Sequence, residues 1–394
     1  MREEVFHYRL ANPTHREIMS HTNHGRKLNF APGPSALPLE VLQKAQSEML
    51  NYNGTGVGVM EMSHRSAEFG EIVNRAISNL IDLMSIPPNY KVLFMQGGGT
   101  GQFAAVAMNL MRLKPGHTAD YFVTGTWSQK AAKEAEKYGK VNYVLPHSKR
   151  FQGVPHSNTW NLDDQASYIY FCSNETIHGV EFHDIPRTNS DIPIVADMSS
   201  NILTREIDVS KYGLIYFGAQ KNVGPAGVTI VIIREDLIGR AMPSTPAVLD
   251  YKTIASNNSL FNTPPCYSIY MCGLVFEWLA SHGGVAAMGE KSDLKSSLLY
   301  EIVDSSRDFY HCTIDKAHRS RVNVTFRIGG ANGDEALEKK FLEEAANLHM
   351  IQLKGHRSIG GIRASLYNAV PVEHTLKLAD FMRDFQRRFG ATEC

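Results

Sequence analysis

The stretch that decides the fold is Leu214-Ile-Tyr-Phe-Gly-Ala-Gln-Lys-Asn-Val-Gly-Pro-Ala-Gly-Val-Thr-Ile-Val-Ile-Ile233. Its two apolar runs, 214–218 and 228–233, are rich in β-branched and aromatic residues and predict two buried strands. The loop between them is rich in glycine and proline, and Lys221 is its single amine. A lysine held between two buried strands is poorly hydrated, which lowers its pKa and makes it a usable nucleophile.

Similar apolar runs occur along most of the chain, and they alternate with segments of helical periodicity. Five further strands are predicted, at 91–96, 120–124, 141–145, 167–172 and 192–197. Helices are predicted around them at 39–50, 69–84, 101–112 and 128–138. Continuous apolar strands that alternate with helices indicate a mostly parallel sheet covered on both faces. We therefore expect an α/β fold with a seven-stranded sheet, whose ligands bind at the carboxyl ends of its strands.

The domain organisation follows from a change in this strand–helix pattern along the chain. After residue 286, short strands (322–328, 351–354, 362–367) lie between helices near 287–304 and 334–349 and a charged helix from 373, which predicts a smaller α+β domain. The expected units are an extension, an N-terminal segment packing with the small domain, a large domain and the small domain, at 1–27, 28–45, 46–285 and 286–394.

The extension is polar and has no helical or strand period. It carries three acidic residues, Glu3, Glu4 and Glu17, which argue against a mitochondrial transit peptide. We expect a disordered segment and a cytoplasmic protein.

The composition of the 394-residue chain limits the classes of partner. Forty basic residues balance forty acidic ones, so charge indicates neither nucleic acid nor an anionic membrane surface. The longest apolar runs are strand-length, too short to span a membrane. Five cysteines without CxxC spacing argue against a zinc site and a disulfide framework. We therefore expect a small-molecule ligand and no metal.

Asp197 ends the apolar run 192–197, twenty-four residues before Lys221. A lysine and a carboxylate at neighbouring strand ends suit pyridoxal 5'-phosphate (PLP). The amine bonds the cofactor as a Schiff base, and the carboxylate keeps the pyridine nitrogen protonated. Taken singly, Lys221 is more simply a solvated loop lysine and Asp197 a helix cap. The pair, together with the motifs below, favours the cofactor.

The glycine cluster 97–101 lies between a predicted strand and a predicted helix. Backbone N–H groups there can surround an anion, and the start of a helix adds a positive dipole end. The cluster lacks the GK[ST] ending of a nucleotide P-loop and the spacing of a dinucleotide fingerprint. A phosphate site is expected, with a plain strand–helix turn as the alternative.

Two residues at strand ends suit a planar ring. Trp127 follows one strand and could stack on a cofactor ring. Thr176 follows another strand and could bond a ring hydroxyl. Core packing for Trp127 and a helix cap for Thr176 are the alternatives.

Two His-Arg pairs form a third group, His64-Arg65 and His356-Arg357, and Arg363 follows the second pair. Arginine binds phosphate and carboxylate bidentately, and histidine adds a donor. The group suggests a substrate with both a phosphate and a carboxylate, and surface ion pairing is the alternative for each arginine.

Six motifs in order resemble the phosphoserine aminotransferase family (class V, fold-type I), and its eukaryotic members most closely. They are Asn29-Phe-Ala-Pro-Gly-Pro-Ser35, Met62-Ser-His-Arg65, Gly97-Gly-Gly-Thr-Gly-Gln-Phe103, Ala219-Gln-Lys-Asn-Val-Gly224, Asn262-Thr-Pro-Pro265 and Gly355-His-Arg-Ser-Ile-Gly-Gly-Ile-Arg363. The resemblance covers residues 28–390. It implies a homodimeric PLP transaminase of serine biosynthesis, which converts 3-phosphohydroxypyruvate and L-glutamate reversibly to O-phospho-L-serine and 2-oxoglutarate.

The resemblance also implies roles for individual residues. Lys221 would be the Schiff-base lysine and proton carrier, Asp197 the partner of the pyridine nitrogen, Trp127 the stacking ring, and Thr176 the contact of the ring hydroxyl. The cofactor phosphate would be held by Gly99, Thr100, Gln220 and, from the neighbouring subunit, Asn262 and Thr263. The substrate phosphate would be bound by His64, Arg65, His356 and Arg357, and its α-carboxylate by Arg363. The side-chain carboxylate of glutamate would take the place of the phosphate.

Two alternatives belong to other classes. Another enzyme of the same fold is one, such as a small-substrate aminotransferase or a cysteine desulfurase. A desulfurase needs a nucleophilic cysteine on a mobile loop, and none of the five cysteines has such a setting. A non-enzymatic binding or scaffold module is the other, and the presence of Lys221 and Asp197 argues against it.

Overall fold

The structure is a computed structural model that describes residues 24–148, 150–186 and 192–390. Most of the predicted N-terminal extension, 1–23, lies outside the described residues. Within them no helix is long and apolar enough to cross a membrane. The four described cysteines are free thiols, and no group of three or more metal-ligating side chains occurs among the described residues.

The predicted seven-stranded sheet forms the centre of the molecule. Its strands are β2 (Tyr90–Met95), β10 (Thr229–Arg234), β9 (Leu214–Gly218), β8 (Ile194–Asp197), β5 (Ile169–Cys172), β3 (Thr118–Phe122) and β4 (Lys140–Tyr143), in that spatial order. All neighbouring pairs are parallel except those that β10 makes with β2 and β9. The mostly parallel prediction is confirmed.

Both faces of the sheet are buried, as the continuous apolar runs require. In β9, Ile215 and Phe217 pack into one hydrophobic cluster, while Leu214 and Tyr216 pack into another on the opposite face. The first face is covered by α3 (Ala67–Met84) and α7 (Cys266–Ser281), and the second by α4 (Gly98–Leu110), α5 (Thr126–Ala135) and α6 (Tyr251–Ser256).

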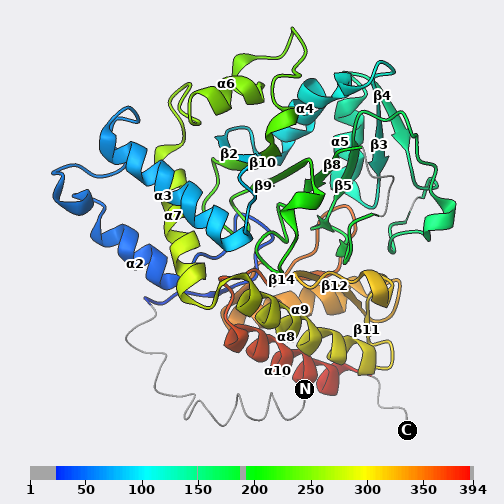
Figure 1. Ribbon diagram of the computed structural model, residues 1–394. Coiled ribbons are helices and arrows are strands. Elements are labelled where there is room, and N and C mark those ends of the chain that lie inside the picture. The colour runs from blue at the N-terminus through cyan, green and yellow to red at the C-terminus, as the bar shows by residue number, and fades with distance from the viewer. Residues whose placement is uncertain (1–23, 149, 187–191, 391–394) are drawn as a thin grey trace.

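Helix α2 (Leu39–Ser47) packs against α7, and the short strand β1 (Leu28–Asn29) pairs in parallel with β13 (Met350–Ile351). A three-stranded sheet, in the order β11 (Tyr310–His311), β12 (Asn323–Ile328) and β14 (Ile362–Ser365), forms a second layer with its own hydrophobic cluster. Helices α8 (Gly284–Ser305), α9 (Glu335–Asn347) and α10 (Val372–Phe389) pack around it (Figure 1).

Helices α4 and α5, like α3, begin earlier than their patterns predicted. Helix α4 begins at Gly98 rather than 101, because Gly97 adopts φ 94° as its N-cap and the following glycines form the first turn. Helix α5 begins at Thr126, so Trp127 lies in its first turn. Both shifts place helix N-terminal N–H groups at the carboxyl edge of the sheet.

Candidate active site

The predicted site residues of the large sheet meet at its carboxyl edge. Asp197 is the last residue of β8, and Lys221 follows the end of β9. Thr176 follows β5 through the two-residue strand β6 (Asn174–Glu175). Helix α4 follows β2, and Trp127 follows β3. Since β2, β3, β5, β8 and β9 run in one direction, all these segments converge at one edge.

Lys221 is at the centre of this group. Its Nζ donates to Thr176 Oγ1 at 2.6 Å, and it lies 5.8 Å from the ring centroid of Trp127. The residue is only half-buried by surface area, yet its amine is closely surrounded by protein atoms, and this desolvation lowers its pKa. The nearby Asp197 carboxylate acts against that shift. The amine is therefore a better nucleophile and base than a surface lysine.

Asp197 is buried and held by two donors. Its Oδ1 accepts from the backbone N–H of Ser199 at 2.9 Å, and its Oδ2 accepts from the hydroxyl of Tyr216 at 3.1 Å. A Cβ on Gly99 would lie 3.9 Å from Oδ2, so the start of α4 lies against this carboxylate. The helix start and the carboxylate are therefore neighbours at the same edge of the sheet.

The start of α4 has the free N–H groups that an anion needs. The N-cap residue Gly97 offers no side-chain cap, so the first-turn N–H groups of Gly98, Gly99 and Thr100 have no partner within the helix. These groups and the helix dipole favour a phosphate. Gln220 is half-buried beside Lys221.

Trp127 is oriented by a residue that the sequence pattern did not reveal. The fully buried Glu175 accepts from the backbone N–H groups of Trp127 (3.0 Å) and Ser128 (2.7 Å) and from the Ser128 hydroxyl (2.6 Å). The carboxylate therefore caps α5 and ties it to the strand end before Thr176. Nε1 of Trp127 is buried without a partner.

The small-domain cations lie beside this edge. Arg363 is buried, and its Nη1 donates to the backbone oxygen of Thr176 at 3.2 Å, while its Nε has no partner. Burial lowers the pKa of Arg363. His356 also has a lowered pKa, because of burial and the charges of Arg363 and Arg357. Arg357 is exposed. An anion near His356 would relieve this repulsion among cations.

Four predicted residues, His64, Arg65, Asn262 and Thr263, are not bonded to Lys221 among the described residues. No hydrogen bond or ion pair among the described residues joins His64, Arg65 or Asn262 to Lys221 or Arg363. His64 is buried, with Nε2 unpartnered, and Arg65 is exposed. The backbone oxygen of Thr263 accepts from Gln96 Nε2 at 3.1 Å, at the end of β2.

The first motif, 29–35, supports the lysine loop. The backbone N–H of Ser35 donates to the oxygen of Gln220 at 3.0 Å, and the Ser35 hydroxyl donates to the oxygen of Lys221 at 2.5 Å. Gly33 has φ +127°, and a Cβ there would lie 2.9 Å from Lys221 Cγ. Gly33 and Ser35 therefore belong to the site because they contact the lysine loop in space, which their distance from it in the sequence does not reveal.

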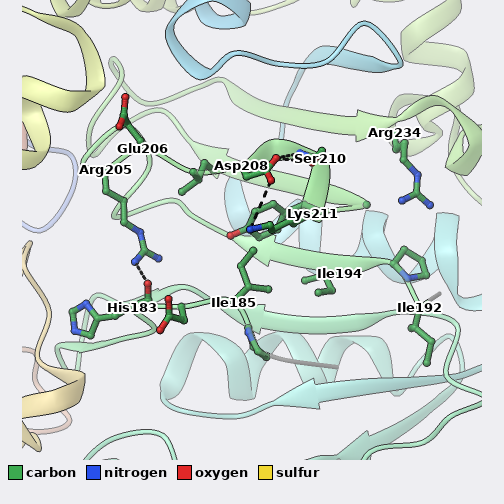
Figure 2. A pocket seen from close by; sticks show the side chains of 16 residues that line it. His183, Ile185, Ile192, Ile194, Arg205, Glu206, Asp208, Ser210, Lys211 and Arg234 are labelled. Atoms are coloured by element: carbon green, nitrogen blue, oxygen red, sulfur yellow. Dashed lines mark hydrogen bonds and ion pairs between the residues drawn. The ribbon is translucent and has the colours of Figure 1, made fainter. Parts of the chain in front are cut away.

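A large pocket along the described residues lies elsewhere. It has a volume of about 870 Å³ and is lined by residues that include Ile194, Gly213 and Arg234, at the amino ends of β8 and β9 and the end of the antiparallel β10 (Figure 2). Its cations are paired: Arg205 with the backbone oxygens of His183 and Phe182, and Lys211 with Asp208. The cavity is at the opposite edge of the sheet from Lys221.

Comparisons with known proteins agree with the geometry. Residues 27–378 match the family model "Aminotransferase class-V". The chain is 55% identical over 360 residues to the phosphoserine aminotransferase of Drosophila melanogaster, which covers 91% of this chain and 98% of that protein. The chain belongs to the phosphoserine aminotransferases of class V.

Solved structures support the membership of this family. The phosphoserine aminotransferase from Bacillus circulans subsp. alkalophilus has a TM-score of 0.88 at 44% identity, covering 93% of this chain and 99% of that one. A PLP-bound phosphoserine aminotransferase from Trichomonas vaginalis has a TM-score of 0.87 at 38% identity, covering 91% and 100%. The predicted family, fold, activity and cofactor are thereby confirmed, so the chain is a PLP-dependent aminotransferase.

The residues present fit that cofactor. The site offers a desolvated amine in Lys221, an acceptor for a ring N–H in Asp197, a hydroxyl in Thr176 and free N–H groups at the start of α4. These are the groups that a pyridine ring with an aldehyde, a hydroxyl and a phosphate requires.

Proposed function

We propose that Lys221, Asp197, Thr176 and Trp127 form the catalytic centre in which this aminotransferase exchanges the amino group between L-glutamate and 3-phosphohydroxypyruvate. The single observation that carries the assignment is the desolvated Lys221 amine, bonded to Thr176 and placed near Trp127. Bound PLP supplies an electron sink for the α-carbon of the amino acid. Lys221 would hold the cofactor covalently until the substrate amine displaces it, and the freed amine would then take the proton from the substrate α-carbon and return it.

The remaining residues of the cofactor site would fix its orientation. Asp197 holds the ring N–H, Thr176 the ring hydroxyl, and Trp127 covers one ring face. Gly99 and Thr100, at the start of α4, and Gln220 hold the phosphate. The half-buried position of Trp127 in the first turn of α5 supports the stacking role.

Substrate binding would use the cations of the small domain. Arg363, buried and with an unpartnered Nε, binds the α-carboxylate. His356 and Arg357 bind the substrate phosphate, and the side-chain carboxylate of glutamate takes the same place. A guanidinium fork suits either anion.

The site would be completed by a second copy of the chain. Among the described residues, His64, Arg65, Asn262 and Thr263 have no hydrogen bond or ion pair to Lys221. The resemblance implied a role for Asn262 and Thr263 in the site of the neighbouring subunit, and we extend that assignment to His64 and Arg65 in a homodimer. Exposed apolar side chains lie close to them in sequence, Leu50, Val57, Met60 and Phe261. Such side chains are favoured in an interface core.

A complementation experiment tests the shared site. At substrate concentrations well below KM, Lys221→Ala is expected to be inactive as a pure dimer and Arg65→Ala nearly so. After subunit exchange at equal concentrations, half of the dimers are mixed and each has one intact site, so about a quarter of the wild-type activity should return. If the mixture stays inactive while mixed dimers form, Arg65 does not act across the interface.

The direct test of the activity supplies O-phospho-L-serine and 2-oxoglutarate and measures L-glutamate. Omission of PLP from the apoprotein is the control. Formation of glutamate only with PLP and with the phosphorylated amino acid supports the proposal, and equal rates with unphosphorylated L-serine would contradict the role of the His-Arg pairs. We further propose a cytoplasmic location. We also propose the domain division 28–45, 46–285 and 286–394; the pairing of β1 with β13 supports the contact of the N-terminal segment with the small domain.

A further inference from the structure

A row of buried tyrosines lies directly behind Asp197. Asp197 is paired in register with Tyr216 on one side and with Cys172 on the other. Tyr170 precedes Cys172 by two residues, so its side chain projects from the same face of the sheet. Tyr216 and Tyr170 are both fully buried in the hydrophobic cluster that α4 covers.

The hydroxyls form a chain that ends on the carboxylate. Tyr216 Oη lies 3.1 Å from Asp197 Oδ2, and Tyr170 Oη lies 2.8 Å from Tyr216 Oη. An ionised carboxylate can only accept, so the single Tyr216 proton points to Asp197. Tyr170 must then be the donor to Tyr216. Burial and the nearby carboxylate raise the pKa of both tyrosines well above the usual value, which keeps these donors protonated.

The carboxylate is therefore held at both oxygens. Ser199 fixes Oδ1 and Tyr216 fixes Oδ2. A Cβ on Gly99 would lie 3.9 Å from both Tyr216 Cε2 and Asp197 Oδ2, so the first turn of α4 confines the pair from above the sheet. Each oxygen keeps a lone pair for a further donor.

We propose that Tyr216, supported by Tyr170, is a positioning residue that aims the Asp197 carboxylate at the ring nitrogen of PLP. This inference rests on the proposed role of Asp197 as the partner of that nitrogen. Tyr216 acts only through Asp197, so its effect must depend on the presence of the ring nitrogen.

The chain contains a matched control pair on the same face of the sheet. Tyr121 and Tyr168 are also fully buried, and their hydroxyls lie 2.7 Å apart. Tyr168→Phe removes one hydroxyl of a buried pair and leaves the other without its partner, as Tyr216→Phe does. Tyr216→Phe should lose more folding stability than Tyr168→Phe, because it also loses the bond to the charged Asp197 carboxylate, whereas the Tyr121–Tyr168 pair has no hydrogen bond to Asp197.

The test measures the affinity of the apoprotein for PLP and for a deaza analogue, in which a C–H group replaces the ring nitrogen. Tyr216→Phe should weaken PLP binding about tenfold, the scale of one lost hydrogen bond to a charged group, and leave analogue binding unchanged. Tyr170→Phe should give a smaller loss with the same selectivity for PLP. Tyr168→Phe should bind both ligands as the wild type does.

Two results would overturn the inference. In the first, Tyr216→Phe lowers the affinity for PLP and the affinity for the analogue by the same factor. In the second, Tyr216→Phe binds PLP as tightly as Tyr168→Phe does. Asp197→Asn separates the two levels of the argument. If Asp197→Asn weakens the binding of PLP and of the analogue equally, the proposed role of Asp197 fails. If it weakens PLP alone while Tyr216→Phe does not, only the role of Tyr216 fails. Should Tyr216→Phe not fold, Tyr170→Phe carries the same comparison.

Discussion

Glu175→Gln tests how the fold holds Trp127 in place. Glu175 accepts three hydrogen bonds from the start of α5, two at Oε1 and one at Oε2. Glutamine keeps one oxygen and places an NH₂ group against an N–H donor. The variant thus loses at least one hydrogen bond to a charged group, about 1.5–3 kcal/mol, and the charge at a helix N-terminus, about 0.3–1 kcal/mol.

One effect acts in the opposite direction. Burial raises the pKa of Glu175 although three donors lower it, so the ionised carboxylate carries a desolvation cost that glutamine avoids. The net loss should therefore be near the lower end of the range, about 2 kcal/mol in the free energy of unfolding. Because α5 also carries Trp127, the affinity for PLP should fall in the same variant.

Chemical denaturation of the apoprotein measures the first quantity, and titration with PLP, followed by tryptophan fluorescence, measures the second. Glu134→Gln is the matched control, since Glu134 lies on the same helix and pairs at its surface with Lys137. That variant should behave as the wild type does. If Glu175→Gln keeps both wild-type stability and wild-type PLP affinity, Glu175 does not orient the start of α5.

Two further substitutions test the surroundings of the lysine and the substrate phosphate. Gly33→Ala should reduce incorporation of PLP, because its Cβ would meet Lys221 Cγ at 2.9 Å. Gly25→Ala is the control, since Gly25 also has a positive φ but has open space around it, and this variant should incorporate PLP normally. If Gly33→Ala keeps the wild-type PLP stoichiometry, the close approach of Gly33 to Lys221 does not matter for cofactor binding. Arg357→Ala should raise KM for O-phospho-L-serine roughly tenfold or more, the loss expected for a charge-assisted bond, and should leave PLP bound; an unchanged KM would exclude Arg357 from the phosphate site.

The sequence was sufficient for the sheet and for the residues at its carboxyl edge. Buried parallel strands such as 214–218 are apolar on both faces, so their runs are continuous and easy to recognise. Helix α7 was not predicted, because it is buried along most of its length and its apolar residues show no helical period.

The supporting residues were hidden for a different reason. Tyr216 looks like any apolar strand residue, and Glu175 lies in a short polar stretch after a strand. Their roles depend on which donors and acceptors meet across strands, as Tyr216 with Asp197 and Glu175 with Ser128 do. A linear pattern carries no information on such contacts. The partner-subunit roles of Asn262 and Thr263 came from the resemblance alone.

The central claim is that Lys221 is the covalent anchor of PLP and the base of the reaction. The most direct measurement is the visible absorption spectrum of the PLP-loaded protein before and after addition of O-phospho-L-serine alone, with the keto acid quantified. We expect the wild-type spectrum to change and about one keto acid to be released per site, since no second substrate resets the cofactor. Lys221→Ala should show no such turnover. A Lys221→Ala protein that releases the keto acid at the wild-type rate would contradict the account.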